Sequence, residues 1–289
     1  MTAIRTSNGR ACTTPPRTFL IHLTMIGIGV VMFYPLTWML SASVRPDSRI
    51  NDPGIWPAGD LTIDGYTTGF AGISGVVFWQ YIGNSLLVST LSVAANLIAC
   101  SLTAYAFARM DFPLRRLWFA VMLATLMLPH HVLLIPQYIE FRTLGWTNTY
   151  LPFVVPKILA TDAFFVFLLV QFFRTIPRDL DEAARLDGCG HFRIFTRIIL
   201  PLSKPALATA AIFSFIYSWN DFFTPLLYLT DTRLFTVPLA LRAFIDTTAG
   251  SAFGALFAMS VVSLLPVLGV FIAFQKLLVE GISTTGLKG

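Results

Sequence analysis

Charged residues are scarce in this chain. Asp, Glu, Lys and Arg make up 12% of its 289 residues, about half the share found in an ordinary soluble domain. So little charge cannot cover a surface that faces water on every side, which excludes such a domain. The net charge of +5 is spread over short loops, so it gives no indication of a nucleic-acid partner.

Cysteine is also scarce, and the common phosphate-binding motif is missing. The three cysteines, Cys12, Cys100 and Cys189, are odd in number and far apart, so we expect unpaired thiols with no disulfide framework and no metal site. No segment has the G-x-x-x-x-G-K-[ST] pattern that cradles phosphates. We therefore expect a chain that hydrolyses no ATP by itself and binds no cofactor.

Hydrophobic residues are abundant instead. They form 55% of the chain, which contains 26 Phe and has a mean hydropathy of +0.71. A spanning helix needs about 20 mostly apolar residues, and backbone groups in hydrocarbon must be hydrogen-bonded within their own segment. We therefore expect an all-α membrane protein with six transmembrane helices. The expected spans are Phe19–Leu40, Ile82–Ala108, Leu117–Ile135, Leu151–Phe173, Pro205–Leu229 and Phe253–Leu278.

The basic residues favour one orientation of these spans. With the N-terminus in the cytoplasm, fourteen of the 20 Lys and Arg residues lie on the inner side and five on the outer side, as the positive-inside rule requires. We expect a cytoplasmic segment at 1–18, retained because no cleavage site is evident. The membrane domain covers 19–279, and a cytoplasmic tail covers 280–289. The outer loop 41–81 is expected to be an ordered cap over the outer mouth, with a flexible linker as the alternative. The segment 136–150 is expected to contain a short interfacial helix.

The cytoplasmic loop 177–204 carries a polar, structured pattern. Asp179 and Glu182 are spaced as a capping box at a helix start, and Gly188 and Gly190 are suited to ending the helix. We expect a short helix at about Leu180–Asp187. One face of it would hold Leu180, Ala183, Ala184 and Asp187, where the alanines allow another surface to approach closely. A capped connector without a partner is the alternative.

A second short stretch follows this helix. Phe192, Phe195 and Ile199 share one side, and Arg193 and Arg197 lie one turn apart on another. Such a pattern is typical of an amphipathic segment at the membrane interface. We expect its aromatic side to face lipid and its guanidinium groups to face water.

The whole loop resembles a known family. Glu182-Ala183-Ala184, then Gly188, then Ile198-Ile199-Leu200-Pro201 resembles the EAA loop in the permeases of binding-protein-dependent ATP-binding-cassette (ABC) importers. Other segments resemble the carbohydrate-importer branch, and in particular the smaller permease of the maltose transporter type. These segments are Asn84-Ser85-Leu86, Ala104-Tyr105-Ala106, Leu128-Pro129, Pro136-Gln137-Tyr138, Leu144-Gly145-Trp146-Thr147-Asn148-Thr149, Trp219-Asn220-Asp221-Phe222 and the final residues from Gly281 to Gly289.

The resemblance implies a type I permease fold and an assembly of five parts in a bacterial or archaeal plasma membrane. The partners would be a second homologous permease, two ATPase subunits that bind ATP and Mg, an extracytoplasmic solute-binding protein, and membrane lipid. The solute would be a mono- or oligosaccharide, with glycerol-3-phosphate or its diesters as the alternative. ATPase coupling would fall on Glu182, Ala183, Ala184, Asp187 and Gly188. The tail, Gly286, Leu287, Lys288 and Gly289, would run between the ATPases.

Polar residues within spans are candidates for the solute path. Asn220 and Asp221, with the aromatic side chains of Tyr217 and Trp219, could line that path in span five. Helix packing, or exposure at the outer end of the span, is the alternative. Ser89, Ser92 and Asn96 share one face of span two; such small polar residues more often pack helices.

Two other classes of protein stay open. A secondary transporter would work without an ATPase, but the six spans show no convincing inverted repeat. An intramembrane enzyme would use His130, His131, Asp162 and Asp221, whose expected depths do not converge. For His130 and His131, interface exposure is favoured over a metal site because further ligands are lacking. Lys157 and Asp162 are five residues apart, a poor spacing for pairing on one helix.

Overall fold

The computed structural model describes residues 15–50, 52, 54, 59, 61–247 and 252–285. Its regular structure is helical, which confirms the expected all-α class; among the described residues the one β-type pairing is a bridge between Ile73 and Val76. In chain order the elements are α1 (Pro15–Ala42), η1 (Asp47–Arg49), α2 (Asp64–Ala71), α3 (Phe78–Arg109), α4 (Arg115–Thr125), α5 (His130–Thr143), α6 (Leu151–Ile158), α7 (Ala163–Thr175), α8 (Asp179–Leu186), α9 (His191–Ile194), the π-helical turn η2 (Phe195–Ile199), α10 (Leu200–Leu202), α11 (Lys204–Trp219), α12 (Phe223–Tyr228), η3 (Thr232–Leu234), α13 (Val237–Thr247) and α14 (Phe253–Thr285).

Four of the expected spans correspond to helices that are long and apolar enough to cross a membrane. Within the described residues these are Thr18–Ala42, Phe78–Arg109, Leu151–Thr175 and Phe253–Lys276. The third of them is interrupted between Ile158, where α6 ends, and Ala163, where α7 begins. A fifth span results if His191–Leu202 and Lys204–Trp219, which meet at 79°, are counted together. The structure thus gives four or five candidate spans where the sequence predicted six.

The predicted span Leu117–Ile135 is wrong as a continuous helix. The chain is helical in α4 up to Thr125, and α5 begins only at His130. Pro129 causes the break, because it has no N–H to donate and disfavours helical geometry in the residue before it. The helix expected within 136–150 is present as α5, but it starts earlier and contains Pro136.

The predicted span Pro205–Leu229 is also interrupted. α11 ends at Trp219, and the chain resumes helical structure at Phe223. Asp221 Oδ1 accepts a hydrogen bond from Thr224 N (3.1 Å) at the start of α12. Asn and Asp side chains favour such turns because they bond to nearby backbone groups.

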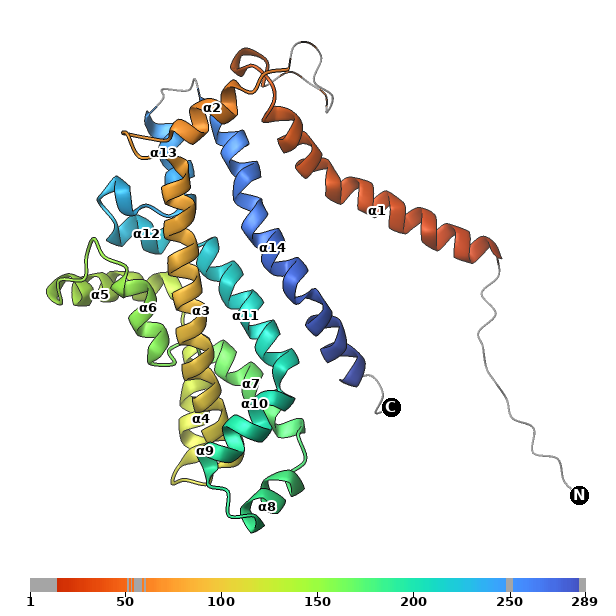
Figure 1. Ribbon diagram of the computed structural model, residues 1–289, viewed down its shortest axis with the longest axis vertical. Coiled ribbons are helices and arrows are strands. Elements are labelled where there is room, and N and C mark those ends of the chain that lie inside the picture. Colours follow the sequence, from red (N-terminus) through yellow and green to blue (C-terminus); the bar gives the residue numbers. More distant parts are fainter. Residues whose placement is uncertain are drawn as a thin grey trace, which may run out of the picture.

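Helix α3 is the central element of the bundle. It packs against α6, α7 and α11, while α11 and α14 lie side by side (Figure 1). Small side chains at the contacts, including Ala104, Ala210 and Ala258, are buried and allow the backbones to approach closely, as is typical of membrane helices. Figure 1 places α8 at one end of α3 and α2 with α13 at the other. The described helices of the two loops, α2 in 41–81 and α8 in 177–204, therefore lie at opposite ends of the bundle.

Helix α1 leaves the bundle. Figure 1 shows it diverging from the other helices toward its N-terminal end, and none of its apolar window is buried by the rest of the chain. Near its other end the Trp38 ring meets Phe257 of α14 edge-on, with centroids 5.3 Å apart. The apolar surface of α1 is thus available to lipid or to another protein.

The described part of the loop 41–81 is ordered, as expected. Arg45 is buried and donates hydrogen bonds to the carbonyl oxygens of Asp52 (3.0 Å) and Gly54 (2.7 Å). Asp47 Oδ1 accepts from Gly254 N (2.7 Å) at the start of α14. This hydrogen bond joins the loop to the N-terminal end of α14.

Candidate functional site

Helix α8 lies in the loop 177–204, where the sequence predicts a short helix. It covers Asp179–Leu186, one residue earlier than expected. Gly188 has φ +79°; its N–H bonds to Arg185 O (2.9 Å), and Cys189 N–H bonds to Ala184 O (2.9 Å). These two bonds are those of a Schellman C-terminus, so the expected role of Gly188 in ending the helix is confirmed.

The capping box predicted at the start of α8 is wrong. The N-cap residue is Arg178, without a side-chain capping bond, and Asp179 already lies inside the first turn. Asp179, Asp181 and Glu182 together place three carboxylates in that turn. There they are stabilised by the positive end of the helix dipole rather than by a reciprocal cap.

A buried ion pair holds α8 to the bundle. Arg109, the last residue of α3, contacts Asp181 with Nη1 and Oδ2 3.2 Å apart, and the two side chains are 1% and 7% exposed. Nη2 of Arg109 also donates to the carbonyl oxygens of Phe173 and Ile176, each at 2.6 Å. One guanidinium thus joins the ends of α3 and α7 to α8.

Sequence reasoning missed this contact. An Arg at the end of a span is expected from the positive-inside rule alone, and Asp181 looks like one more first-turn acid. The two residues are 72 positions apart, so no local spacing connects them. One signal was available in the sequence. Asp181 lies three residues before Ala184 and therefore on the same side of α8, the side that faces the bundle.

The two faces of α8 differ in exposure. Glu182, Ala183 and Asp187 are exposed, and Leu186 is 90% exposed. Ala184 is instead 7% exposed and belongs to the core formed by α3, α7, η2 and α11. The small side chain of Ala184 therefore allows close packing within this chain, and the surface left for a partner is the opposite face.

The segment 192–199, which follows α8, does not expose the whole apolar side that the sequence predicted to face lipid. Phe195 and Ile199 are 4% and 0% exposed, whereas Phe192 is 74% exposed. The Phe195 ring lies 5.2 Å from that of Tyr105 in α3. The π-helical turn η2 thus packs against α3, and π-helical turns are frequent at functional sites.

The four residues predicted for the solute path do not share one surface. Tyr217 is 64% exposed, and Asn220 and Asp221 are at least partly exposed. Trp219 is 3% exposed and stacks on Phe215, with centroids 5.6 Å apart. The structure therefore leaves Tyr217, Asn220 and Asp221 available and places Trp219 in the core.

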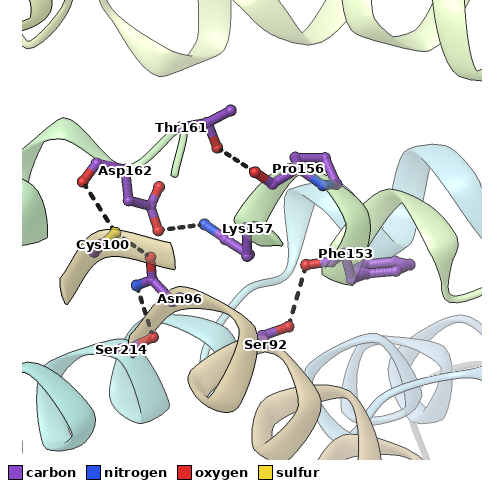
Figure 2. A network of polar contacts seen from close by, with 9 residues as sticks. All are labelled: Ser92, Asn96, Cys100, Phe153, Pro156, Lys157, Thr161, Asp162 and Ser214. Carbon is purple, nitrogen blue, oxygen red and sulfur yellow. Dashed lines mark hydrogen bonds and ion pairs between the residues drawn. The ribbon is translucent and has the colours of Figure 1, made fainter. Parts of the chain in front are cut away.

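A network of polar contacts joins α3, α11 and the break between α6 and α7 (Figure 2). Ser92 Oγ donates to Phe153 O (3.1 Å), and Asn96 Nδ2 donates to Ser214 Oγ (3.1 Å). These bonds confirm helix packing as the role of both residues. Lys157 Nζ and Asp162 Oδ2 are 2.8 Å apart, so the expectation that these two would not pair is wrong. They meet because the helix is interrupted between them.

The sequence predicts no metal site in this chain. Among the residues the structure describes, no three His, Cys, Asp or Glu side chains are grouped to hold a metal ion. Cys100 and Cys189 are free thiols, as expected. Cys12, the side chains of His130 and His131, and Gly286, Leu287, Lys288 and Gly289 lie outside the described residues.

Comparisons with known proteins agree on one family. The family model for the inner membrane component of binding-protein-dependent transport systems matches residues 95–284. The arabinooligosaccharide transport permease AraQ of Halalkalibacterium halodurans is 33% identical over 96% of this chain and 99% of its own. The trehalose/maltose transport permease MalG of Thermococcus litoralis is 31% identical over 93% and 96%. A solved bacterial ABC transporter involved in import of the acidic polysaccharide alginate has the same fold, with a TM-score of 0.78 and 24% identity over 91% of this chain and 98% of that chain.

Proposed function

We propose that this chain, which belongs to the inner membrane components of binding-protein-dependent transport systems, is the permease subunit of an ATP-driven carbohydrate importer. Membership of the family makes it a transport component of an ABC importer. The relatives named for arabinooligosaccharides and for trehalose and maltose support a mono- or oligosaccharide as the solute. The chain forms half of the translocation path and receives energy through α8.

One observation carries the coupling part of this proposal. Helix α8 is fastened to the bundle on its inner face by Arg109 and Asp181, while its outer face presents Glu182, Ala183 and Leu186 to solvent. A short helix that is rigidly held yet exposed at one end of the bundle can pass on a push from a partner. ATP-driven closure of two ATPases would then rotate the attached spans as a rigid body.

The exposed apolar surface supports partners in the membrane. None of the apolar window of α1 is buried by this chain, so lipid or the second homologous permease covers it. The assembly would further contain two ATPase subunits, which bind ATP and Mg, and an extracytoplasmic solute-binding protein. The charge pattern of the loops supports cytoplasmic termini, with the tail Gly286–Gly289 running between the ATPases.

The experiment compares a charge reversal on α8 with one outside it. Glu182→Lys is the test. Asp111→Lys is the control, since Asp111 is also an exposed acid (84%) but lies outside α8. The complex is purified with its ATPases, reconstituted in liposomes, and given ATP and loaded binding protein. We expect Glu182→Lys to abolish uptake and weaken retention of the ATPase, while Asp111→Lys changes both by less than about threefold, as a screened surface charge should.

Three outcomes would contradict the proposal. Normal uptake and ATPase retention in Glu182→Lys would remove the coupling role of α8. Uptake by the chain without ATPase subunits would instead indicate a secondary transporter. Uptake of glycerol-3-phosphate in place of maltose and arabinotriose would overturn the carbohydrate assignment.

A further inference from the structure

The pair formed by Lys157 and Asp162 lies within a membrane-spanning segment. Both residues belong to the candidate span Leu151–Thr175, and their side chains are 33% and 26% exposed. Charged groups at such a depth face the protein interior or water rather than lipid. The open side of the pair must therefore face the translocation path or a partner subunit.

An interruption of the helix builds this site. α6 ends at Ile158 and α7 starts at Ala163, and Ala160 adopts a left-handed φ of +54°, a conformation that costs an alanine about 1–2 kcal/mol. On a continuous helix, residues five apart point about 140° away from each other. The break brings the two charges together, and Thr161 Oγ1 stabilises it by donating to Pro156 O (3.0 Å).

Neighbouring helices fix the position of the pair. Figure 2 shows Asp162 above Cys100; the Cys100 thiol donates to Asn96 Oδ1 (2.9 Å), and its sulfur lies 3.8 Å from the Asp162 carbonyl oxygen. Asn96 in turn is bonded to Ser214 of α11. The backbone of Asp162 thus lies against α3, which Asn96 joins to α11.

Unused donors and acceptors remain at the site. Within the part of the chain that the structure describes, the Lys157 ammonium makes one of its three possible hydrogen bonds, and Asp162 Oδ1 makes none. A hydroxyl group can accept from the ammonium and donate to the carboxylate at the same time. Because the two charges cancel, the site suits an uncharged solute.

An exposed aromatic ring lies close to the same break. Tyr217 of α11, 64% exposed, contacts Phe165 of α7 with ring centroids 6.4 Å apart. Phe165 N bonds to the carbonyl oxygen of Asp162 (3.1 Å), and Ser214, in the polar network, precedes Tyr217 by one turn. Aromatic faces pack against the C–H surfaces of sugar rings, so ring and ion pair complement each other.

We propose that Lys157, Asp162 and Tyr217 form a contact site for an uncharged, polyhydroxylated solute in the translocation path. This inference rests on the proposed function and names the residues that recognise the solute as it crosses. The pair supplies hydroxyl recognition and electrical neutrality, and Tyr217 supplies a stacking surface.

The test uses the complete complex in liposomes with loaded binding protein and radiolabelled maltose or arabinotriose. We expect Asp162→Asn and Tyr217→Ala each to reduce uptake about tenfold or more, the effect of losing a charged hydrogen bond or a stacking surface. ATPase stimulation by the binding protein should change by less than about twofold, because the coupling helix is untouched. Tyr217→Phe, which keeps the ring, should retain uptake.

A second variant separates recognition from mere packing. Lys157→Met/Asp162→Leu removes both charges, an exchange that is often neutral for folding, and we expect assembly and ATPase stimulation without uptake. Restored uptake in this variant would mean that the pair is only structural and would overturn the inference. Unchanged uptake in Tyr217→Ala, whose side chain is 64% exposed, would do the same. Failure of the unaltered complex to take up either sugar would instead count against the proposed function.

Discussion

Replacing Arg109 should loosen the attachment of α8 more than replacing Asp181. With Arg109→Met, Asp181 stays buried without its cation, and the carbonyl oxygens of Phe173 and Ile176 lose a donor held at 2.6 Å. With Asp181→Leu, the guanidinium keeps both carbonyl acceptors. The two halves of the pair are therefore unequal, because the guanidinium has other acceptors and the carboxylate has no other donor among the described residues.

The magnitudes follow from burial. Removing one partner of a buried ion pair costs about 3–5 kcal/mol, and the side chains here are 1% and 7% exposed, so Arg109→Met should fall in that range. Asp181→Leu should cost about 1.5–3 kcal/mol, the effect of one charged hydrogen bond. The double variant should cost less than the sum of the singles, with an interaction free energy of about 1–3 kcal/mol.

The assay has a stability arm and a transport arm. Unfolding free energies of the purified chain come from SDS titration in mixed micelles, and uptake per ATP hydrolysed comes from the reconstituted complex. Asp111→Leu is the control, because Asp111 forms an ion pair with Arg115 at 2.7 Å but is 84% exposed, and such surface pairs contribute about 0–1 kcal/mol. Arg109→Met should lower uptake per ATP, and Asp111→Leu should not.

Two results would refute this reasoning. Additive single effects, within about 0.5 kcal/mol, would mean that Arg109 and Asp181 do not interact. Equal uptake per ATP in Arg109→Met and in the unaltered complex would mean that α8 needs no attachment to α3 in order to transmit movement.

Two further predictions concern α8. Gly188→Ala should destabilise the loop by about 1–2 kcal/mol, because the φ of Gly188 is +79°. Gly190→Ala is the control and should change little, because φ is −77° there and the added carbon has open space around it. Limited proteolysis should cleave the Gly188→Ala loop faster, and equal cleavage of the two variants would contradict the prediction. Leu186→Ser should leave the unfolding free energy of the chain within about 0.5 kcal/mol, as a surface substitution does, since Leu186 is 90% exposed. It should nevertheless weaken ATPase binding measured by co-purification, and unchanged binding would exclude Leu186 from the interface.

Local sequence signals were sufficient for much of this fold. Long apolar runs determined α1, α3 and α14, because the backbone groups of a segment in hydrocarbon must be hydrogen-bonded within that segment, as they are in a helix. Gly188 determined where α8 ends, because the left-handed conformation is accessible to glycine at little cost. The breaks at Pro129 and Asp221 were also present as local signals, but the hydrophobicity of the surrounding residues concealed them.

Tertiary structure decided what those elements do together. Arg109 and Asp181 are 72 residues apart, and only the packing of α3 and α7 against α8 makes them partners. Lys157 and Asp162 are near in sequence, yet they pair because the helix is interrupted at Ala160, a residue with no intrinsic preference for its left-handed conformation. The spacing of residues along the chain determines which of them share a face of a helix. Contacts between helices, and a strained break such as the one at Ala160, depend instead on the free energy of the whole bundle.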